Sequence, residues 1–277
     1  MKSILLQATY IMRHPSWWVG VALSFAAMMQ GMLSDGLIHG MNLAYQIVTS
    51  MNAGVFIPLA PMAAILSVSK NMENAMRNTC CYTHLLRTGR QHFIVNMIVS
   101  AGIAGGTALA FGWLLSALIA ITLGSAPLVG DNMLGLEQTS MGILLTNANQ
   151  AWLYYFLRLL FVFLYGFFCV CCAAPIAAWR QDSAMLCLIP FVMLRVAQFF
   201  LYKSVSAFFS PTRILLGFVE ENINLLGAIL MDIAGLVLLS SILVECAATV
   251  FKRRLQLDQT ENKSIPYFII VAVSYNS

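Results

Sequence analysis

Six long stretches of almost entirely apolar residues run through the chain. An α-helix rises about 1.5 Å per residue and needs ~20 apolar residues to cross ~30 Å of hydrocarbon. The stretches of this kind are residues 17–33, 47–68, 93–123, 151–179, 184–202 and 225–251. An open strand would leave backbone N–H and C=O groups unpaired in lipid, so each stretch is expected to be helical. The sequence therefore predicts an all-α, polytopic membrane protein with six transmembrane helices.

The composition favours a lipid environment over a water-exposed surface. Hydrophobic residues make up 60% of the 277 residues and charged residues make up 9%. A soluble domain carries about 25% charged residues. The alternative is a soluble all-helical protein with an unusually apolar core. The length of the apolar stretches favours the membrane protein.

The distribution of Lys and Arg predicts the orientation of the chain. With the N-terminus inside, the cytoplasmic segments hold eleven Lys and Arg residues, and the external segments hold only Lys203 and Arg213. The eleven are Lys2, Arg13, Lys70, Arg77, Arg87, Arg90, Arg180, Lys252, Arg253, Arg254 and Lys263. Segments rich in Lys and Arg remain in the cytoplasm. We therefore expect a multi-pass protein of the cytoplasmic membrane with both termini inside, in which residues 15–251 form the membrane domain and residues 252–277 a cytoplasmic tail.

Residues 1–14 are predicted to form an amphipathic helix. The residues expected on its apolar face are Ile4, Leu5, Ala8, Ile11 and Met12, and Pro15 follows as a break. A helix of this kind lies in the membrane interface, here at the inner leaflet. The alternative is that these residues are the frayed start of the first span.

Two connections between spans are also predicted to contain short helices. In the cytoplasmic connection, Asn71 is expected to cap a helix over about residues 70–86, suited to docking a cytosolic partner. The alternative is a solvated extension of the third span. In the external connection, about residues 204–222 are too apolar for a free loop and too short to span, which predicts a re-entrant hairpin. The apolar residues 265–273 are likewise too short to span.

Charged residues inside the predicted spans need a partner, because an ionised group near mid-bilayer is costly. Arg158, Arg195 and Asp232 each lie about seven residues from the predicted outer end of a span, a depth of ~10 Å. This shared depth predicts one buried charge cluster that joins spans four, five and six. Its role is either an internal ion pair that fixes helix packing or a polar patch on a translocation path. Glu245 lies nearer the inner end and is expected to reach Lys252 or Arg253.

Small residues in the third span predict a close helix contact. Gly102 and Gly106 are separated by four positions, the spacing at which small residues let two transmembrane helices approach.

Sequence motifs for nucleotide, metal or nucleophilic chemistry are missing. The chain has no G-x-x-x-x-G-K-[ST], no H-E-x-x-H and no G-x-S-x-G. Its four histidines are scattered and predict no metal site. No basic, aromatic surface indicates nucleic-acid binding. We therefore expect neither catalytic residues nor a cofactor in this chain.

The layout resembles the permease subunit of an ABC-2 type ABC transporter. The resemblance is carried by the N-terminal interfacial helix, the six spans and the external apolar hairpin. It is carried also by the stretch from Pro58-Leu-Ala-Pro-Met-Ala-Ala-Ile-Leu through Lys70-Asn-Met-Glu73 to Leu86-Arg-Thr-Gly-Arg90-Gln-His-Phe93. Family members often have a proline-bearing second span, then an acidic residue, and a basic turn before the third span.

The resemblance implies an ATP-driven exporter that works with a separate ABC ATP-binding subunit. A second permease copy, identical or not, would complete the unit in the lipid bilayer. The residues implied to couple to the ATPase are Lys70, Glu73, Arg77, Arg87 and Arg90. Substrates in the family include peptides and antibiotics, lipid-linked glycans and drugs. ATP hydrolysis would belong to the partner and not to this chain.

Two other functions are compatible with six spans. An ion-coupled secondary transporter would need repeated halves and helices broken at mid-membrane, and the sequence shows no internal repeat. A non-transporting polytopic membrane protein is the second alternative.

Overall fold

The described part of the chain is all-helical. The computed structural model describes residues 2–34, 43–53, 55–77, 90–122, 144, 150–179, 185, 187–194, 196 and 225–264. Its helices are α1 (Lys2–Met12), α2 (Pro15–Ser34), α3 (Leu43–Ala53), α4 (Phe56–Arg77), α6 (Arg90–Thr122), α8 (Ala151–Trp179) and α11 (Leu225–Ser264). Residues 187–194 are helical as well.

Within the described residues, four helices are long and apolar enough to cross a membrane. The spanning stretches are Pro15–Leu33 in α2, Phe93–Thr122 in α6, Ala151–Trp179 in α8 and Asp232–Arg253 in α11. They correspond to the first, third, fourth and sixth of the predicted spans. The chain is thus a helical protein with the character of a polytopic membrane protein.

The other two predicted spans are not among these four stretches. The predicted second span, residues 47–68, is not one helix, because α3 ends at Ala53 and α4 begins at Phe56. The predicted fifth span, residues 184–202, is described as helix only over residues 187–194. The predicted external hairpin, residues 204–222, lies outside the described residues, as does the apolar stretch 265–273.

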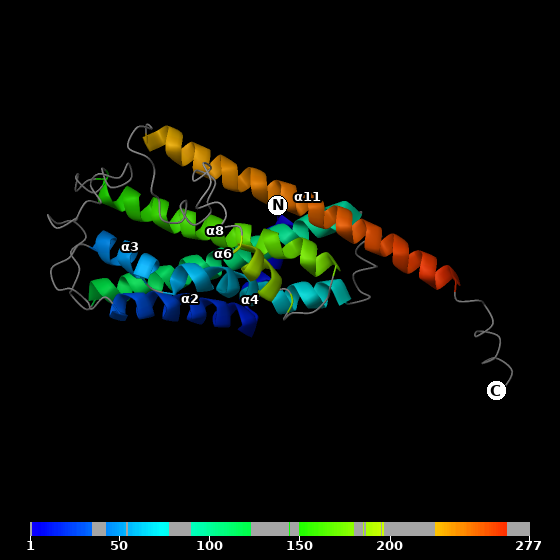
Figure 1. Ribbon diagram of the computed structural model, residues 1–277, viewed down its shortest axis with the longest axis horizontal. Coiled ribbons are helices and arrows are strands. Elements are labelled where there is room, and N and C mark those ends of the chain that lie inside the picture. The colour runs from blue at the N-terminus through cyan, green and yellow to red at the C-terminus, as the bar shows by residue number, and fades with distance from the viewer. Residues whose placement is uncertain are drawn as a thin grey trace.

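The long helices form an elongated bundle (Figure 1). α6 and α8 share the largest interface, α2 packs on both α4 and α6, and α11 packs on α8. α2 and α6 run in one direction along the bundle, whereas α4, α8 and α11 run in the other. Since α8 and α11 run the same way, the end of α8 at Trp179 and the start of α11 at Leu225 lie toward opposite ends of the bundle.

Glycines allow α6 and α8 to approach closely. A Cβ built on Gly106 would lie 2.6 Å from the backbone oxygen of Phe163, and one on Gly102 would lie 2.7 Å from the Phe167 ring. From the other side, a Cβ on Gly166 would lie 2.9 Å from the Cα of Gly106. The close helix contact predicted from Gly102 and Gly106 is therefore confirmed.

Basic residues gather at one end of the bundle. α4 ends and α6 begins there, and α11 continues past both of these helix ends (Figure 1). The Lys and Arg positions in this region of the three helices are Lys70, Arg77, Arg90, Lys252, Arg253, Arg254 and Lys263. We call this the basic end. Among the described helices that follow α1, Arg158 near the start of α8 is the one Lys or Arg that lies away from the basic end.

Candidate functional site

The first turn of α2 is tied to α4 and α6, the two helices that meet the basic end. The Ser16 hydroxyl donates to the backbone oxygen of Ser67 in α4 at 3.1 Å. The indole N–H of Trp17 donates to the backbone oxygen of Ala104 in α6 at 2.9 Å. His14 and Ser16 also share a 2.9 Å side-chain hydrogen bond. These bonds fix where α2 begins relative to α4 and α6.

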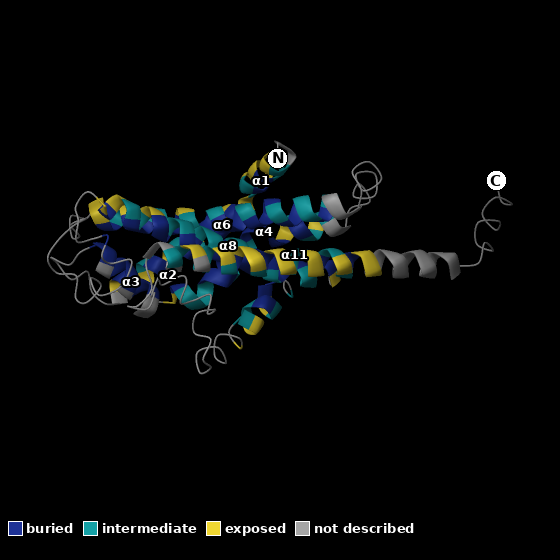
Figure 2. Ribbon diagram, turned by 90° about the horizontal axis from the view of Figure 1, so that it is seen from above, coloured by how far each residue is buried: buried dark blue, intermediate teal, exposed yellow. Residues whose placement is uncertain are grey.

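α1 lies across the bundle rather than along it (Figure 2). It packs on α6, and the Ser100 hydroxyl donates to the side-chain oxygen of Gln7 at 3.4 Å. Of the residues predicted to form its apolar face, Ala8 and Ile11 are buried against the bundle, whereas Leu5 is exposed. The outward face carries further large apolar side chains, Leu6 and Tyr10. α1 therefore has apolar residues on both sides.

Beyond the level of α1, α4 and α6 continue toward the basic end. Residues 68–77 of α4 and 90–99 of α6 each add about ten residues, or ~15 Å of helix. Three of the predicted coupling residues, Lys70, Glu73 and Arg77, lie in this part of α4, and helical periodicity places them on one stripe. Lys70 is exposed and Glu73 is half-buried. Arg90 is the first residue of α6.

The predicted coupling helix differs from the structure in where it begins. Asn71 does not start a separate helix, because residues 70–77 are the last two turns of α4. The apolar side of these turns explains the continuity, since Met72 is buried in the core together with Ile94 of α6. Arg87 and the rest of residues 78–89 lie outside the described residues.

Arg158 is buried near the opposite end of the bundle. It is 2% exposed, and its Nε donates to the Tyr154 hydroxyl one turn earlier at 3.1 Å. Its guanidinium carbon lies 5.2 Å from the centre of the Tyr154 ring, within the range of a cation–π contact. The guanidinium is thus held inside the protein by the ring and hydroxyl of Tyr154.

Of the other two members of the predicted charge cluster, the structure describes Asp232 but not Arg195. Asp232 is half-buried on α11, which packs on α8. Arg158 and Asp232 each lie about two turns into their helices, and the two helices run in the same direction. Arg195 lies outside the described residues. The ion pairing of this cluster therefore stays a prediction.

At the break between α3 and α4, a backbone N–H group is paired with a side chain of another helix. The N–H of Val55 donates to the side-chain oxygen of Gln30 in α2 at 3.1 Å. Eight residues before the break, Gln46 of α3 is 8% exposed, and among the described residues neither atom of its amide has a hydrogen-bond partner. A buried unpaired amide is costly. Gln46 lies one residue before the predicted second span and about two turns before the point at which the helix is interrupted.

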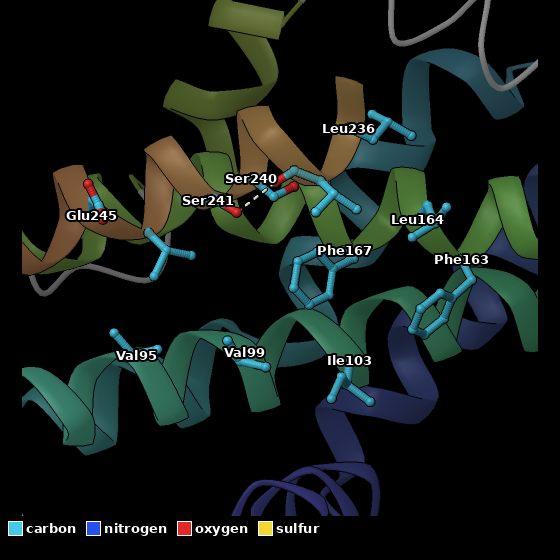
Figure 3. A pocket seen from close by; sticks show the side chains of 12 residues that line it. Val95, Val99, Ile103, Phe163, Leu164, Phe167, Leu236, Ser240, Ser241 and Glu245 are labelled. Carbon is cyan, nitrogen blue, oxygen red and sulfur yellow. Dashed lines mark hydrogen bonds between the residues drawn. The ribbon is translucent and has the colours of Figure 1, made fainter. Parts of the chain in front are cut away.

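A groove opens between α6, α8 and α11, and we call it the lateral groove (Figure 3). Its volume is about 500 Å³. The lining residues are Val95, Val99 and Ile103 of α6, Phe163, Leu164 and Phe167 of α8, and Leu236, Val237, Ser240, Ser241, Val244 and Glu245 of α11. The groove exists because α11 packs closely on α8 and only sparsely on α6.

Sequence reasoning missed this groove and predicted other neighbours for Glu245. Within the described residues, the Glu245 carboxylate contacts neither Lys252 nor Arg253, which are exposed farther along α11. It lies instead at the end of the lateral groove (Figure 3). The spacing of Val237, Ser241 and Glu245 places them on one stripe of α11. That stripe was readable from the sequence, but its neighbours on α6 and α8 were not.

Groupings that would suit a metal ion are not found in the described ranges. No three or more His, Cys, Asp or Glu side chains come together there in a way that could hold a metal ion. Comparison of the chain with protein-family models, with curated proteins and with solved structures found no match in any of the three. A proposal for the function therefore depends on the geometry of the helices and on the charges that they carry.

Proposed function

We propose that this chain is the membrane-spanning permease subunit of an ATP-driven exporter of the ABC-2 type. In this proposal a separate ABC ATP-binding subunit docks at the basic end, and a second permease copy completes the translocation unit. The chain itself hydrolyses no ATP. The membrane is the cytoplasmic membrane, and the basic end faces the cytoplasm.

The observation that carries the proposal is the pair of helical extensions at the basic end. α4 and α6 each continue ~15 Å past the level at which α1 crosses the bundle. The last turns of α4 carry Lys70, Glu73 and Arg77, and Arg90 is the first residue of α6. Such rigid extensions suit the transmission of a movement from a cytosolic partner to the spanning helices.

The positions of the charges also support a protein partner at this end. A projecting helix with mixed charges on one stripe can form ion pairs across an interface, which fix register and partner choice. The buried side of the same turns, with Met72 in the core, couples any displacement of the stripe to the packing of α4 on α6. A push on α4 would therefore reach the bundle interior.

One observation favours a second candidate, an ion-coupled secondary transporter. That class builds its binding sites at helices broken within the membrane. The break between α3 and α4, with the unpaired amide of Gln46 nearby in sequence, has this character. The repeated halves that such transporters have are missing from the sequence. Transport that needs an ion gradient and no ATPase would favour this candidate.

The test of the exporter is recovery of an ATPase with the affinity-tagged chain from native membranes. We expect a subunit with a G-x-x-x-x-G-K-[ST] motif to co-purify. Glu73→Lys and Arg87→Glu should each lower its recovery several-fold, because both reverse a charge in the segment proposed to contact the ATPase.

A matched control changes charge at the other end of the bundle. Thr122→Glu alters the exposed last residue of α6, far from the basic end, and should leave ATPase recovery at the wild-type level. All variants should reach the membrane in equal amounts. Undiminished recovery with both Glu73→Lys and Arg87→Glu would refute the assignment of this segment to ATPase coupling.

A further inference from the structure

The lateral groove has an apolar interior and a mixed rim. On α11, Leu236 and Ser240 are buried at the inner side, whereas Val237, Ser241 and Glu245 are exposed along the outer edge. The lining residues of α6 and α8 are all half-buried aliphatic or aromatic side chains. The groove is therefore open toward the outside of the bundle and can be reached from the surrounding lipid.

The size of the groove suits a single amphipathic molecule. Its volume of about 500 Å³ lies within the ~300–1,000 Å³ that is usual for small-molecule sites. Its long direction follows the helices, with Phe163 and Leu236 toward one end and Val95 and Glu245 toward the other (Figure 3). An elongated chain fits this shape better than a compact molecule does.

The two ends of the groove lie on opposite sides of the level marked by α1. α1 contacts α6 at Ser100, which falls between the lining residues Val99 and Ile103. An amphipathic helix settles at the boundary between headgroups and acyl chains. The end near Phe163 would then lie in the hydrocarbon, and the end near Glu245 would lie among the headgroups.

The carboxylate of Glu245 determines which charge on a ligand the groove favours. Glu245 is the only ionisable side chain among the twelve lining residues, and none of the twelve is Lys or Arg. The Ser241 hydroxyl is already used, because it donates to the backbone oxygen of Val237 at 2.8 Å. Within the described residues the Glu245 carboxylate has no side-chain partner. A cationic group is thus favoured there and an anionic one is disfavoured.

We propose that the lateral groove binds an amphipathic cation, a molecule with one hydrocarbon chain and one positively charged group. The chain lies along Val99, Ile103 and Phe167, and the charged group pairs with Glu245. This molecule is the class of substrate that the protein exports. The last statement rests on the proposed exporter function, whereas the binding does not.

The experiment measures binding to the purified full chain in phosphatidylcholine nanodiscs, with no ATPase present. The probe is a photoactivatable analogue of dodecyltrimethylammonium, whose charge does not depend on pH. We expect labelling of peptides that contain the lining residues of α6, α8 and α11. Unlabelled dodecyltrimethylammonium should compete, whereas dodecanol and dodecyl sulfate should compete poorly.

Variants of the carboxylate separate charge from shape. Glu245→Gln should lower the affinity for the cation by about tenfold, because a charge pair at the edge of an apolar groove is stronger than one in bulk water. Glu245→Lys should reverse the preference, so that a photoactivatable dodecyl sulfate labels the groove instead. Val99→Trp should reduce both reactions by filling the groove. Ile242→Gln is the matched control, since Ile242 is exposed on α11 but does not line the groove.

The outcomes separate the groove from the exporter. Labelling that is spread over all lipid-facing helices, or that is unchanged in both Glu245 variants, would overturn the groove as a cation site, and the ATPase assignment would not be affected. Absence of labelling in α11 would show that the groove is closed to ligands, and this result would also overturn the groove as a cation site. Charge-dependent labelling without any recoverable ATPase would keep the binding site and overturn its role in export.

Discussion

At the scale of single residues, the burial of Arg158 is the least ordinary feature of the molecule. A guanidinium in the membrane-spanning part of a bundle is costly unless its N–H groups are paired. Here the Tyr154 hydroxyl accepts from Nε, and the ring of Tyr154 lies against the guanidinium. The one-turn spacing on α8 explains the contact, because residues four apart are neighbours on a helix. The sequence revealed the charge but not the tyrosine as its partner.

Replacing Tyr154 tests this contact. Tyr154→Phe keeps the ring and removes the hydroxyl, so it should cost ~1 kcal/mol, as typical for a hydrogen bond in a membrane protein. The expected result in detergent is a Tm lower by ~2–4 °C. Tyr10→Phe should have no effect, because Tyr10 is exposed on α1. Equal melting of the Tyr154 variant and the wild type would mean that the hydroxyl does not stabilise Arg158.

At the scale of elements, the contact of α6 with α8 holds the centre of the bundle together. Lipid tails are as apolar as Leu, so transmembrane helices gain from close packing rather than from the hydrophobic effect. Gly106 and Gly166 provide that closeness, because their backbones nearly touch. α11 lacks such a contact with α6, and only 22% of its spanning stretch is buried, against 56% for α6 and for α8. The lateral groove follows from this difference.

A glycine pair on different helices tests the packing. Gly106→Ala should destabilise the protein by ~1–3 kcal/mol, because the new Cβ would meet the Phe163 backbone, which cannot move aside cheaply. Gly235→Ala on α11 is the control, since nothing lies within 4 Å of its Cβ position. It should be neutral or stabilise by up to about 1 kcal/mol, since Ala favours helix. The measurement is thermal unfolding, and equal effects of the two changes would contradict the packing.

At the scale of the whole molecule, the distribution of charge along the bundle decides its expected orientation. The Lys and Arg positions that follow α1 in the described helices lie at the basic end, apart from the buried Arg158. Loops rich in these residues are retained in the cytoplasm. We therefore expect the end at which α4 stops and α6 starts to face the cytoplasm.

Accessibility of single cysteines tests this orientation. In a background without the native cysteines, Thr122→Cys should react with a membrane-impermeant maleimide in intact cells, whereas Lys252→Cys should react only after permeabilisation. Both side chains are exposed and lie toward opposite ends of the bundle. Reaction at position 252 in intact cells would invert the orientation, and the proposed docking of a cytosolic ATPase would fail with it.

The sequence alone determined the class of structure and the character of four spans. Whether a stretch such as 151–179 enters lipid depends on its own transfer free energy, which is a sum over its residues. The unequal distribution of Lys and Arg can also be read from the sequence, because it depends only on where these residues stand along the chain. The contact at Gly102 and Gly106 was also predicted from the sequence, because small residues four positions apart let a neighbouring helix approach closely.

Tertiary structure decided the features that bring remote residues together. The break between α3 and α4 lies inside a stretch that hydropathy predicted as one span, and Val55 finds its partner on another helix, at Gln30. The burial of Ala8 and Ile11 rather than Leu5 depends on where α6 lies. The position of Glu245 at the groove depends on how far α11 stands from α6. Hydropathy is local to a segment, whereas the face that a helix turns to its neighbours is set by packing against all of them.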